Sequence, residues 1–323
     1  MPASVCFVTP TYAPDLWRFA LLRQSVRLFS PGIRHYALLD SEDFPMFQER
    51  FRDDPGVEFV VSRDLMPRRI EQRRLRSRSW QGALLRRIAW RTRMLPDPLN
   101  GWNLQQLKKL YFLKQSPAPN AVFLDSDMVL CAPVLPEYFF HGDALRLLEK
   151  PAQTLEDHAF DVCTHLLLHT PLQQRQTFYN YILQAPRFQR ETAEALFVQL
   201  EGRSDMQDWQ DRFMALPFPC EYNLLGYAAR ELQAYDGYFR EPASPHDWIY
   251  DMRFQGDESH LEAALATCVE ERGTRRVLRV QSTLEVGETE CTDRIARMLA
   301  QLHAIHALQG GVAEEAHGER VFA

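Results

Sequence analysis

The sequence predicts an α/β fold with a mostly parallel central sheet and helices on both of its faces. The chain has 323 residues, enough for one large domain with its own core, and its 46% hydrophobic and 25% charged content is ordinary for a globular protein. Between residues 4 and 65, short apolar runs alternate with segments of helical spacing. Such alternation is typical of parallel sheets, which bind ligands beyond the carboxyl ends of their strands.

The amino-terminal elements follow this alternation in order. The runs SVCFVTPTY, IRHYALLD and VEFVVSRDL predict three strands, and Asp40 ends the second of them. The first strand is followed by a helix over DLWRFALLRQSVRLF, in which Leu16, Phe19, Leu22 and Val26 are near helical spacing. The segment SEDFPMFQERF predicts a short helix between the second and third strands.

The later elements include the one that carries the most informative motif. NLQQLKKLYFLKQ predicts a helix with Asn103 as its N-cap, and AVFLDSDMVLC predicts a central strand that runs to Cys131. The pattern is less regular afterwards. The remaining predictions are a strand at LRLLEK, helices up to about residue 200, a strand at RRVLRVQ, a closing helix at DRIARMLAQLHAIHAL and an undecided region over 160–170.

No internal repeat or clear linker divides the chain. We expect a catalytic domain over 1–250, with a nucleotide-binding half over about 1–134 and an acceptor half over about 135–250. Residues 251–323 are expected to pack on that domain as an extension, with a flexible tail after 310. The six cysteines include no CxxC pair, and neither a signal peptide nor a membrane-length apolar segment is evident, which indicates a cytoplasmic protein.

Positive charge is concentrated in one segment of an acidic chain. Ten arginines and a single acid, Glu71, lie between Arg68 and Arg93, so this segment carries +9 although the net charge of the chain is −6. Such a segment could bind an anionic ligand or make a peripheral membrane contact, and a solvated helix face is the alternative. The overall acidity and the absence of a recognisable module argue against a nucleic-acid binder.

The stretch AVFLDSDMVLC places two carboxylates, Asp125 and Asp127, within an apolar run. In a strand they would point to the same face, because side chains alternate along a strand. Two adjacent, partly buried carboxylates are costly without a cation or strong donors, and a hard divalent metal such as Mn²⁺ or Mg²⁺ meets that demand. Ordinary salt bridges or loop caps are the alternative.

Two enzyme families have an apolar strand that leads into such a motif. LDSDMV resembles the nucleophile motif of the haloacid-dehalogenase-like phosphatases, which would make Asp125 a nucleophile. In that family the motif usually opens the fold, whereas here three predicted strands precede it, and no second acidic pair follows a later apolar strand. The phosphatase interpretation is therefore the weaker one.

The second resemblance is to glycosyltransferases of the GT-A class, in which DxD lies in mid-domain after a nucleotide-binding half. GWNLQQLKKL, FLDSDMVL, FDVCTHLLLH and CEYNLLGY are similar in order and spacing to a bacterial GT-A-like family of unknown function with the motifs GWxxQQxxK, DSD and SEYxxYG. The resemblance covers roughly residues 5–227. Cys220 and Leu225 stand where that pattern has Ser and Tyr, so the acceptor pocket is expected to differ.

This resemblance implies a metal-dependent glycosyltransferase that transfers a sugar from a nucleotide donor, such as a UDP-sugar, to a glycan or lipid-linked acceptor. The implied metal ligands are Asp127, Asp125 and a downstream histidine, for which His246 is the candidate and His165 a weaker one. The metal would neutralise charge on the departing nucleoside diphosphate. A GT-A-like protein that binds a nucleotide or glycan without turnover is the second class of hypothesis.

The same resemblance implies further donor-site residues. Thr9, Tyr12 and Asp40 would contact the nucleotide, with a loop hydroxyl, a packing aromatic and a helix N-cap as the respective alternatives. Gln105, Gln106 and Lys109 precede the DxD segment, and a lysine there can hold a phosphate. The alternative for these three is a solvated helix surface.

Glu221 is the candidate catalytic residue on the acceptor side. It lies in the apolar segment PFPCEYNLLGY, where a desolvated carboxylate could act as a base on the acceptor hydroxyl. It could equally bind that hydroxyl without moving a proton, and a buried structural hydrogen bond is the alternative to either role.

Overall fold

The computed structural model describes residues 4–78, 101–170, 177–182, 185–203, 205, 208–242, 249–252, 258–271, 276–280 and 288–318. The helices are α1 (Leu16–Phe29), α2 (Phe44–Arg50), α3 (Ser62–Leu65), α4 (Arg68–Arg78), α6 (Gly101–Gln115), α7 (Leu155–Leu168), α8 (Arg190–Glu201), α9 (Trp209–Ala215), α10 (Glu221–Tyr227), α11 (Glu258–Glu270) and α12 (Glu288–Gly318). Short 3-10 helices lie at η1 (Ala13–Asp15) and η2 (Pro136–Phe139), and a π-helical turn lies at η4 (Ala228–Leu232).

The strands are β1 (Val5–Pro10), β2 (Arg34–Leu39), β3 (Val57–Val61), β4 (Asn120–Phe123), β5 (Met128–Leu130), β6 (Phe140–His141), β7 (Ala144–Pro151), β8 (Tyr179–Asn180), β9 (Arg187–Gln189), β10 (Tyr238–Pro242), β11 (Ile249–Met252) and β12 (Val277–Val280). Within the described residues, the central sheet has the order β3-β2-β1-β4-β9. The pairs β3–β2, β2–β1 and β1–β4 are parallel, and only β4–β9 is antiparallel. The predicted α/β fold with a mostly parallel sheet is therefore confirmed.

The strand order places a ligand-binding crevice at one point of this sheet. The chain builds β1, β2 and β3 outward in one direction and then returns to add β4 on the other side of β1. At such a reversal the connections leave neighbouring strands toward opposite faces, which opens a crevice at their carboxyl ends. The loops that follow Pro10 and Phe123 lie at this point.

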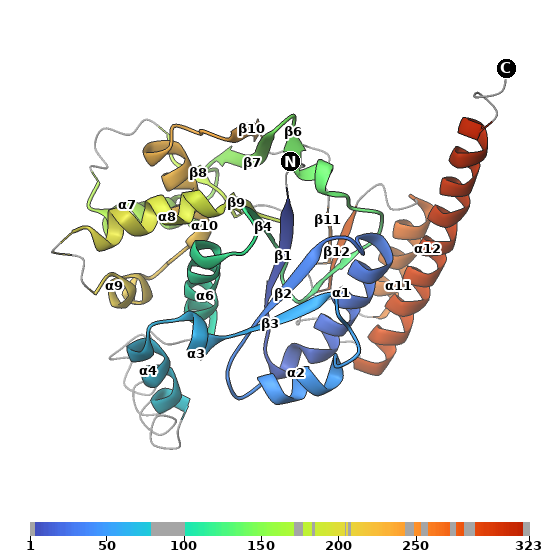
Figure 1. The fold of residues 1–323 in the computed structure, drawn as a ribbon, viewed down its shortest axis with the longest axis horizontal. Coiled ribbons are helices and arrows are strands. Elements are labelled where there is room, and N and C mark those ends of the chain that lie inside the picture. The colour runs from blue at the N-terminus through green and yellow to red at the C-terminus, as the bar shows by residue number, and fades with distance from the viewer. Residues whose placement is uncertain are drawn as a thin grey trace.

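Helices cover the sheet because each buries an apolar stripe against it. In α1 the buried residues include Phe19, Leu22, Val26 and Phe29, which are spaced three or four residues apart. Figure 1 shows α1 and α2 on one side of the central strands and α6 on the other. The helix α12 runs beside α1 and α11, and β12 pairs with β5, so both ends of the chain contribute to one body (Figure 1).

The DxD segment is not part of one continuous strand, contrary to the sequence prediction. The strand β4 ends at Phe123, and Leu124–Asp127 forms a turn that leads into β5, which belongs to a different sheet. Leu124 N still donates to Val8 O (2.9 Å), but Met128 N donates back to Asp125 O (3.1 Å) and closes the turn. Asp125 and Asp127 therefore lie in the turn after β4, and do not project from one face of a strand as the sequence predicts.

One smaller prediction, the N-cap at Asn103, also differs from the structure, and two further segments are defined by it. Asn103 lies inside α6, and its Nδ2 donates to Met214 O (3.0 Å) instead of capping the helix. The undecided region over 160–170 belongs mostly to α7, which begins with a capping box between Thr154 and Asp157. The helix α12 continues to Gly318, past residue 310, where the sequence suggests a frayed tail.

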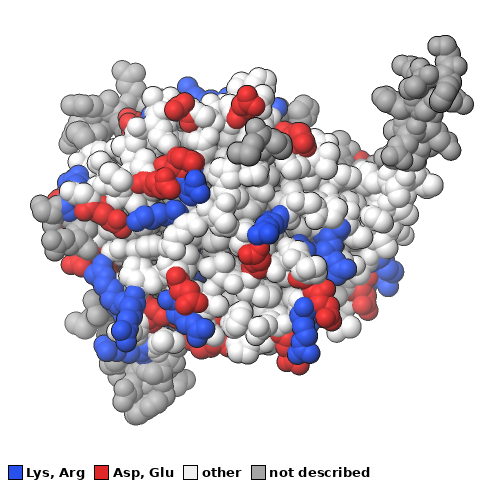
Figure 2. All heavy atoms as spheres, in the orientation of Figure 1, with Lys and Arg blue, Asp and Glu red and all other residues white. Residues whose placement is uncertain are grey.

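The surface shows no large field of one charge on the face seen in Figure 2, where basic and acidic side chains alternate. Three arginines in the described part of the arginine-rich segment form ion pairs: Arg69 with Asp208 (2.5 Å), Arg73 with Asp211 (2.8 Å) and Arg74 with Glu71 (2.7 Å). Its remainder, residues 79–93, lies outside the described residues.

Among the helices described here, none is long and apolar enough to cross a bilayer. All six cysteines are free and buried.

Candidate active site

A cavity of about 380 Å³ opens at the carboxyl ends of β1 and β4, at the point where the strand order reverses. Four stretches of the chain converge on it: the loop after β1, the first turns of α6, the loop after β4 and the start of α10. The lining residues are Pro10, Asp15, Trp102, Gln105, Gln106, Lys109, Asp125, Ser126, Asp127, Ile182, Cys220, Glu221 and Tyr222. Six of the ten sequence-named candidates that the structure describes therefore meet here.

The two DxD carboxylates differ in their surroundings. The Asp125 side chain is half exposed, and its oxygens lie 3.5 Å from Lys109 Nζ and 3.9 Å from an Arg279 nitrogen on β12. Asp127 is more deeply placed, and no described residue donates a hydrogen bond to its buried Oδ1. Burial and the neighbouring Asp125 raise the pKa of Asp127 to about 7. An unpartnered carboxylate oxygen beside a second carboxylate is the arrangement that a cation stabilises.

Lys109 is the buried cation of the site. Its Nζ donates to the hydroxyl of Tyr222 (2.7 Å) and lies 3.0 Å from Glu221 Oε1, in addition to its contact with Asp125. Burial alone would lower the pKa of this lysine, but Glu221, Tyr222 and Asp125 hold it well above its ordinary value. Lys109 is therefore charged and links the DxD turn to the start of α10.

Glu221 is held in place by both its backbone and its side chain. Cys220 caps α10 by accepting from Asn223 N (3.4 Å), which fixes the first turn of the helix. Glu221 N donates to Gln106 Oε1 (3.0 Å), while the buried Nε2 of Gln106 has no described partner. The site thus presents both an unpartnered acceptor, Asp127 Oδ1, and an unpartnered donor, Gln106 Nε2.

Thr9, Tyr12 and Asp40 do not line this cavity. Thr9 is fully buried, and its hydroxyl lies 2.8 Å from His35 Nε2 beneath the sheet edge. Asp40 is buried and forms ion pairs with Lys108 and with Arg74 (3.4 Å). Thr9 lies within β1 and Asp40 directly follows β2, but both side chains face groups other than the open cavity.

Three residues at the site, Asp15, Tyr222 and Arg279, were not among the sequence candidates. Asp15 accepts from Ser126 Oγ (2.9 Å) and pairs with Arg18 (2.7 Å), so η1 is bonded directly to the DxD turn. Tyr222 adjoins Glu221 within the CEYNLLGY motif, so the motif itself could have indicated it. Arg279 comes from a strand more than a hundred residues downstream, and no local signal marks it.

Of the two histidines named as additional metal ligands, His165 does not line the cavity. His165 is fully buried, bonds to Thr170 and lies 3.6 Å from Asp161, so it belongs to the interior of α7. His246 lies outside the described residues. Where side chains are described, no group of three or more His, Cys, Asp and Glu is arranged to hold a metal ion. Two carboxylates still fit a divalent ion that takes its other ligands from water and phosphate oxygens, as Mg²⁺ commonly does.

Comparison with known sequences identifies the family. The profile of a family of unknown function, DUF6492, matches residues 4–298. The chain belongs to this family. No curated protein matches it.

Similar solved structures are glycosyltransferases, at low identity. One is the bifunctional glycosyltransferase WbbM in its apo form, with a TM-score of 0.41 and 10% identity; the match covers 92% of this chain and only 50% of WbbM. The galactosyltransferase LgtC in complex with donor and acceptor sugar analogues has a TM-score of 0.38 and 11% identity, covering 91% of this chain and 95% of LgtC. The Q189E variant of LgtC has a TM-score of 0.41 and 11% identity, covering 90% and 95%.

Proposed function

We propose that this protein is a metal-dependent glycosyltransferase of the GT-A type, which transfers a sugar from a nucleotide donor to a glycan or lipid-linked acceptor. The observation that carries the proposal is the unpartnered Oδ1 of Asp127 beside Asp125, in a cavity at the reversal point of a parallel sheet. Sheets of this topology bind nucleotides at that point. The family resemblance in the GWNLQQLKKL, DSD and EYNLLGY segments supports the same reaction.

Asp127 and Asp125 would hold Mn²⁺ or Mg²⁺. When bound, the metal supplies positive charge that stabilises the departing nucleoside diphosphate. The amide groups of Gln105 and Gln106 would donate to the donor substrate; in support, both residues line the cavity and the buried Gln106 Nε2 has no described partner. Lys109 contributes charge to the same region, although its ammonium is already bonded to Tyr222 and Glu221 and is not a free phosphate ligand.

We assign Glu221 to the acceptor. Its carboxylate is buried, and Oε1 lies 3.0 Å from the ammonium nitrogen of Lys109. A carboxylate oxygen in this place would accept a hydrogen bond from the acceptor hydroxyl and orient it, whether or not it also takes the proton. Thr9 and Asp40 would act indirectly, by holding His35 and Lys108. Tyr12, the N-cap of η1, stays a candidate for contact with the base or ribose.

Calorimetry with UDP tests the donor site. The parent protein should bind UDP in the presence of Mn²⁺ and lose that binding in EDTA. Asp127→Ala should weaken Mn²⁺-dependent UDP binding at least tenfold, about 1.4 kcal/mol, whereas the exposed Asp64→Ala should bind as the parent does. Equal binding by Asp127→Ala and the parent would remove the metal role proposed here.

Incubation with a panel of nucleotide sugars tests turnover. A transferase is expected to release nucleoside diphosphate slowly by hydrolysis and faster when a suitable acceptor is added. A protein that binds the nucleotide but releases no diphosphate from any donor would be the non-catalytic alternative.

Sedimentation with anionic vesicles at low and high salt tests the membrane contact proposed for Arg68–Arg93, and no cosedimentation at low salt would exclude it.

A further inference from the structure

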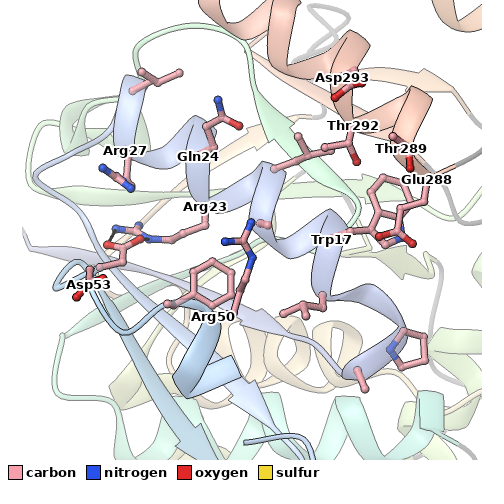
Figure 3. A pocket seen from close by; sticks show the side chains of 18 residues that line it. Trp17, Arg23, Gln24, Arg27, Arg50, Asp53, Glu288, Thr289, Thr292 and Asp293 are labelled. Atoms are coloured by element: carbon pink, nitrogen blue, oxygen red, sulfur yellow. Dashed lines mark hydrogen bonds and ion pairs between the residues drawn. The ribbon is translucent and has the colours of Figure 1, made fainter. Parts of the chain in front are cut away.

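A second and larger cavity lies outside the candidate active site. It has a volume of about 1080 Å³ and forms a groove between α1, the end of α2 and the start of α12 (Figure 3). Trp17, Gln24 and Arg27 line it from α1, Arg50 from α2 and Glu288 from α12. The proposed transfer reaction assigns no role to any of these residues.

The groove and the active-site cavity are separated by one short turn. Ala13 and Pro14 of η1 line the groove, whereas Asp15 of the same turn lines the active-site cavity and bonds to Ser126 of the DxD turn. A chain-like ligand in the groove would therefore lie close to the reacting groups without occupying their cavity.

Unpaired charges of both signs face one another across the groove. Arg27 and Arg50 lie on the α1 and α2 side, and Glu288 and Asp293 lie on α12 opposite them (Figure 3). These four side chains and Asp53 are exposed, and none of them forms an ion pair with another residue in the described ranges. They remain available to a ligand.

An ion pair that adds no net charge forms the floor of the groove. Arg23 is buried and donates through Nε and Nη2 to the two oxygens of Asp54 (2.8 and 2.9 Å). Asp54 Oδ1 also accepts from Gly56 N (3.1 Å). Because this pair neutralises itself, the charge that a ligand meets comes from the opposed side chains above it.

This composition selects the chemical class of the ligand. A strongly anionic ligand would be repelled by the three free acids, and a strongly cationic one by the two free arginines. A neutral ligand rich in hydroxyl groups finds partners of both kinds, since each hydroxyl both donates and accepts. Trp17, partly exposed on the wall, adds an aromatic surface for the apolar face of a sugar ring.

We propose that this groove binds a neutral oligosaccharide independently of metal and nucleotide. This inference goes beyond sugar transfer, because binding in the groove requires neither the DxD carboxylates nor Glu221. A peptide of mixed charge is the other class of ligand that such walls could accept, and binding measurements separate the two.

The test uses the full chain in EDTA without nucleotide, on an array of neutral, sialylated and phosphorylated oligosaccharides, with calorimetry on the best neutral ligand. Arg50→Ala and Glu288→Ala should each lower the affinity at least fivefold. Arg52→Ala and Glu156→Ala are matched controls, because these exposed residues do not line the groove, and they should bind as the parent does. Circular dichroism verifies that each variant is folded.

Several results would overturn the proposal: no neutral glycan bound, only acidic glycans bound, parent-like affinity in both groove variants, or tighter binding of a mixed-charge peptide library than of any glycan. Asp127→Ala should keep glycan binding, and its loss there would place the glycan in the active-site cavity instead. Groove-dependent glycan binding by a protein that fails to bind UDP would contradict the proposed transferase function while leaving this inference intact.

Discussion

The ammonium nitrogen of Lys109 lies 3.0 Å from Oε1 of Glu221, and both side chains are buried. This contact joins α6, which precedes the DxD turn, to the first residue of α10. It brings the donor side and the acceptor side of the proposed site into one charged cluster, so the integrity of the cluster should be measurable as stability as well as activity.

Lys109→Met is expected to destabilise the protein by about 3–5 kcal/mol, because it leaves the buried Glu221 carboxylate without its cation. Urea denaturation measures the loss. The double variant Lys109→Met/Glu221→Gln removes both charges and should recover a large part of that loss. A single-variant effect below about 1 kcal/mol would show that the pair is not the buried cluster described here.

Asp127→Asn should make the metal-free protein more stable at about pH 8. Burial and Asp125 raise the native pKa of Asp127 to about 7, above its unfolded value near 3.9. The native state therefore binds more protons between these values, and stability is lost as the pH rises through about 7. In EDTA, the stability advantage of the variant should grow from about pH 4 to pH 8. A parent more stable than the variant at pH 8 would contradict this, and Asp64→Asn should show no such trend.

His35 should make the protein less stable in mild acid. Burial, with Arg23 nearby, lowers the pKa of His35 to about 3, below the unfolded value of about 6.5. The unfolded state then binds more protons below about pH 6.5, so stability falls as the pH decreases, by about 2 kcal/mol at pH 5. Comparing urea midpoints of the parent and His35→Gln at pH 7.5 and 5 isolates this contribution. The same pH dependence in both proteins would show that His35 does not contribute.

Gly56→Ala should destabilise the protein by about 1–3 kcal/mol. A Cβ at residue 56 would lie 2.2 Å from Arg23 Nη2, which is fixed by its bonds to Asp54, so the buried pair must shift. Gly32→Ala is the matched control, because nothing lies within 4 Å of its Cβ position, and its effect should stay within about 0.5 kcal/mol. Equal thermal midpoints for the two variants would show that Arg23 is not fixed.

Part of the candidate site was predictable because its residues carry local signals. Asp125 and Asp127 interrupt an apolar run, and Gln105, Gln106, Lys109 and Glu221 belong to motifs that resemble a family, so all six could be named from sequence and all six line one cavity. Thr9 and Asp40 carried similar signals, yet their side chains are bonded to His35 and to Lys108 and Arg74. Which partner a polar side chain finds depends on segments that the local pattern does not include.

The sequence by itself determined the order and type of the elements from β1 to β3, because apolar runs and helical spacing are local properties of the chain. Only the tertiary structure decided that β4 ends at Phe123 and that the DxD carboxylates occupy a turn between two sheets, since β5 pairs with β12 from the far end of the chain. The same long-range packing brings Lys109 to Glu221 and sets α12 across from α1 to form the groove. These contacts arise from burial shared between distant segments, which no stretch of sequence specifies alone.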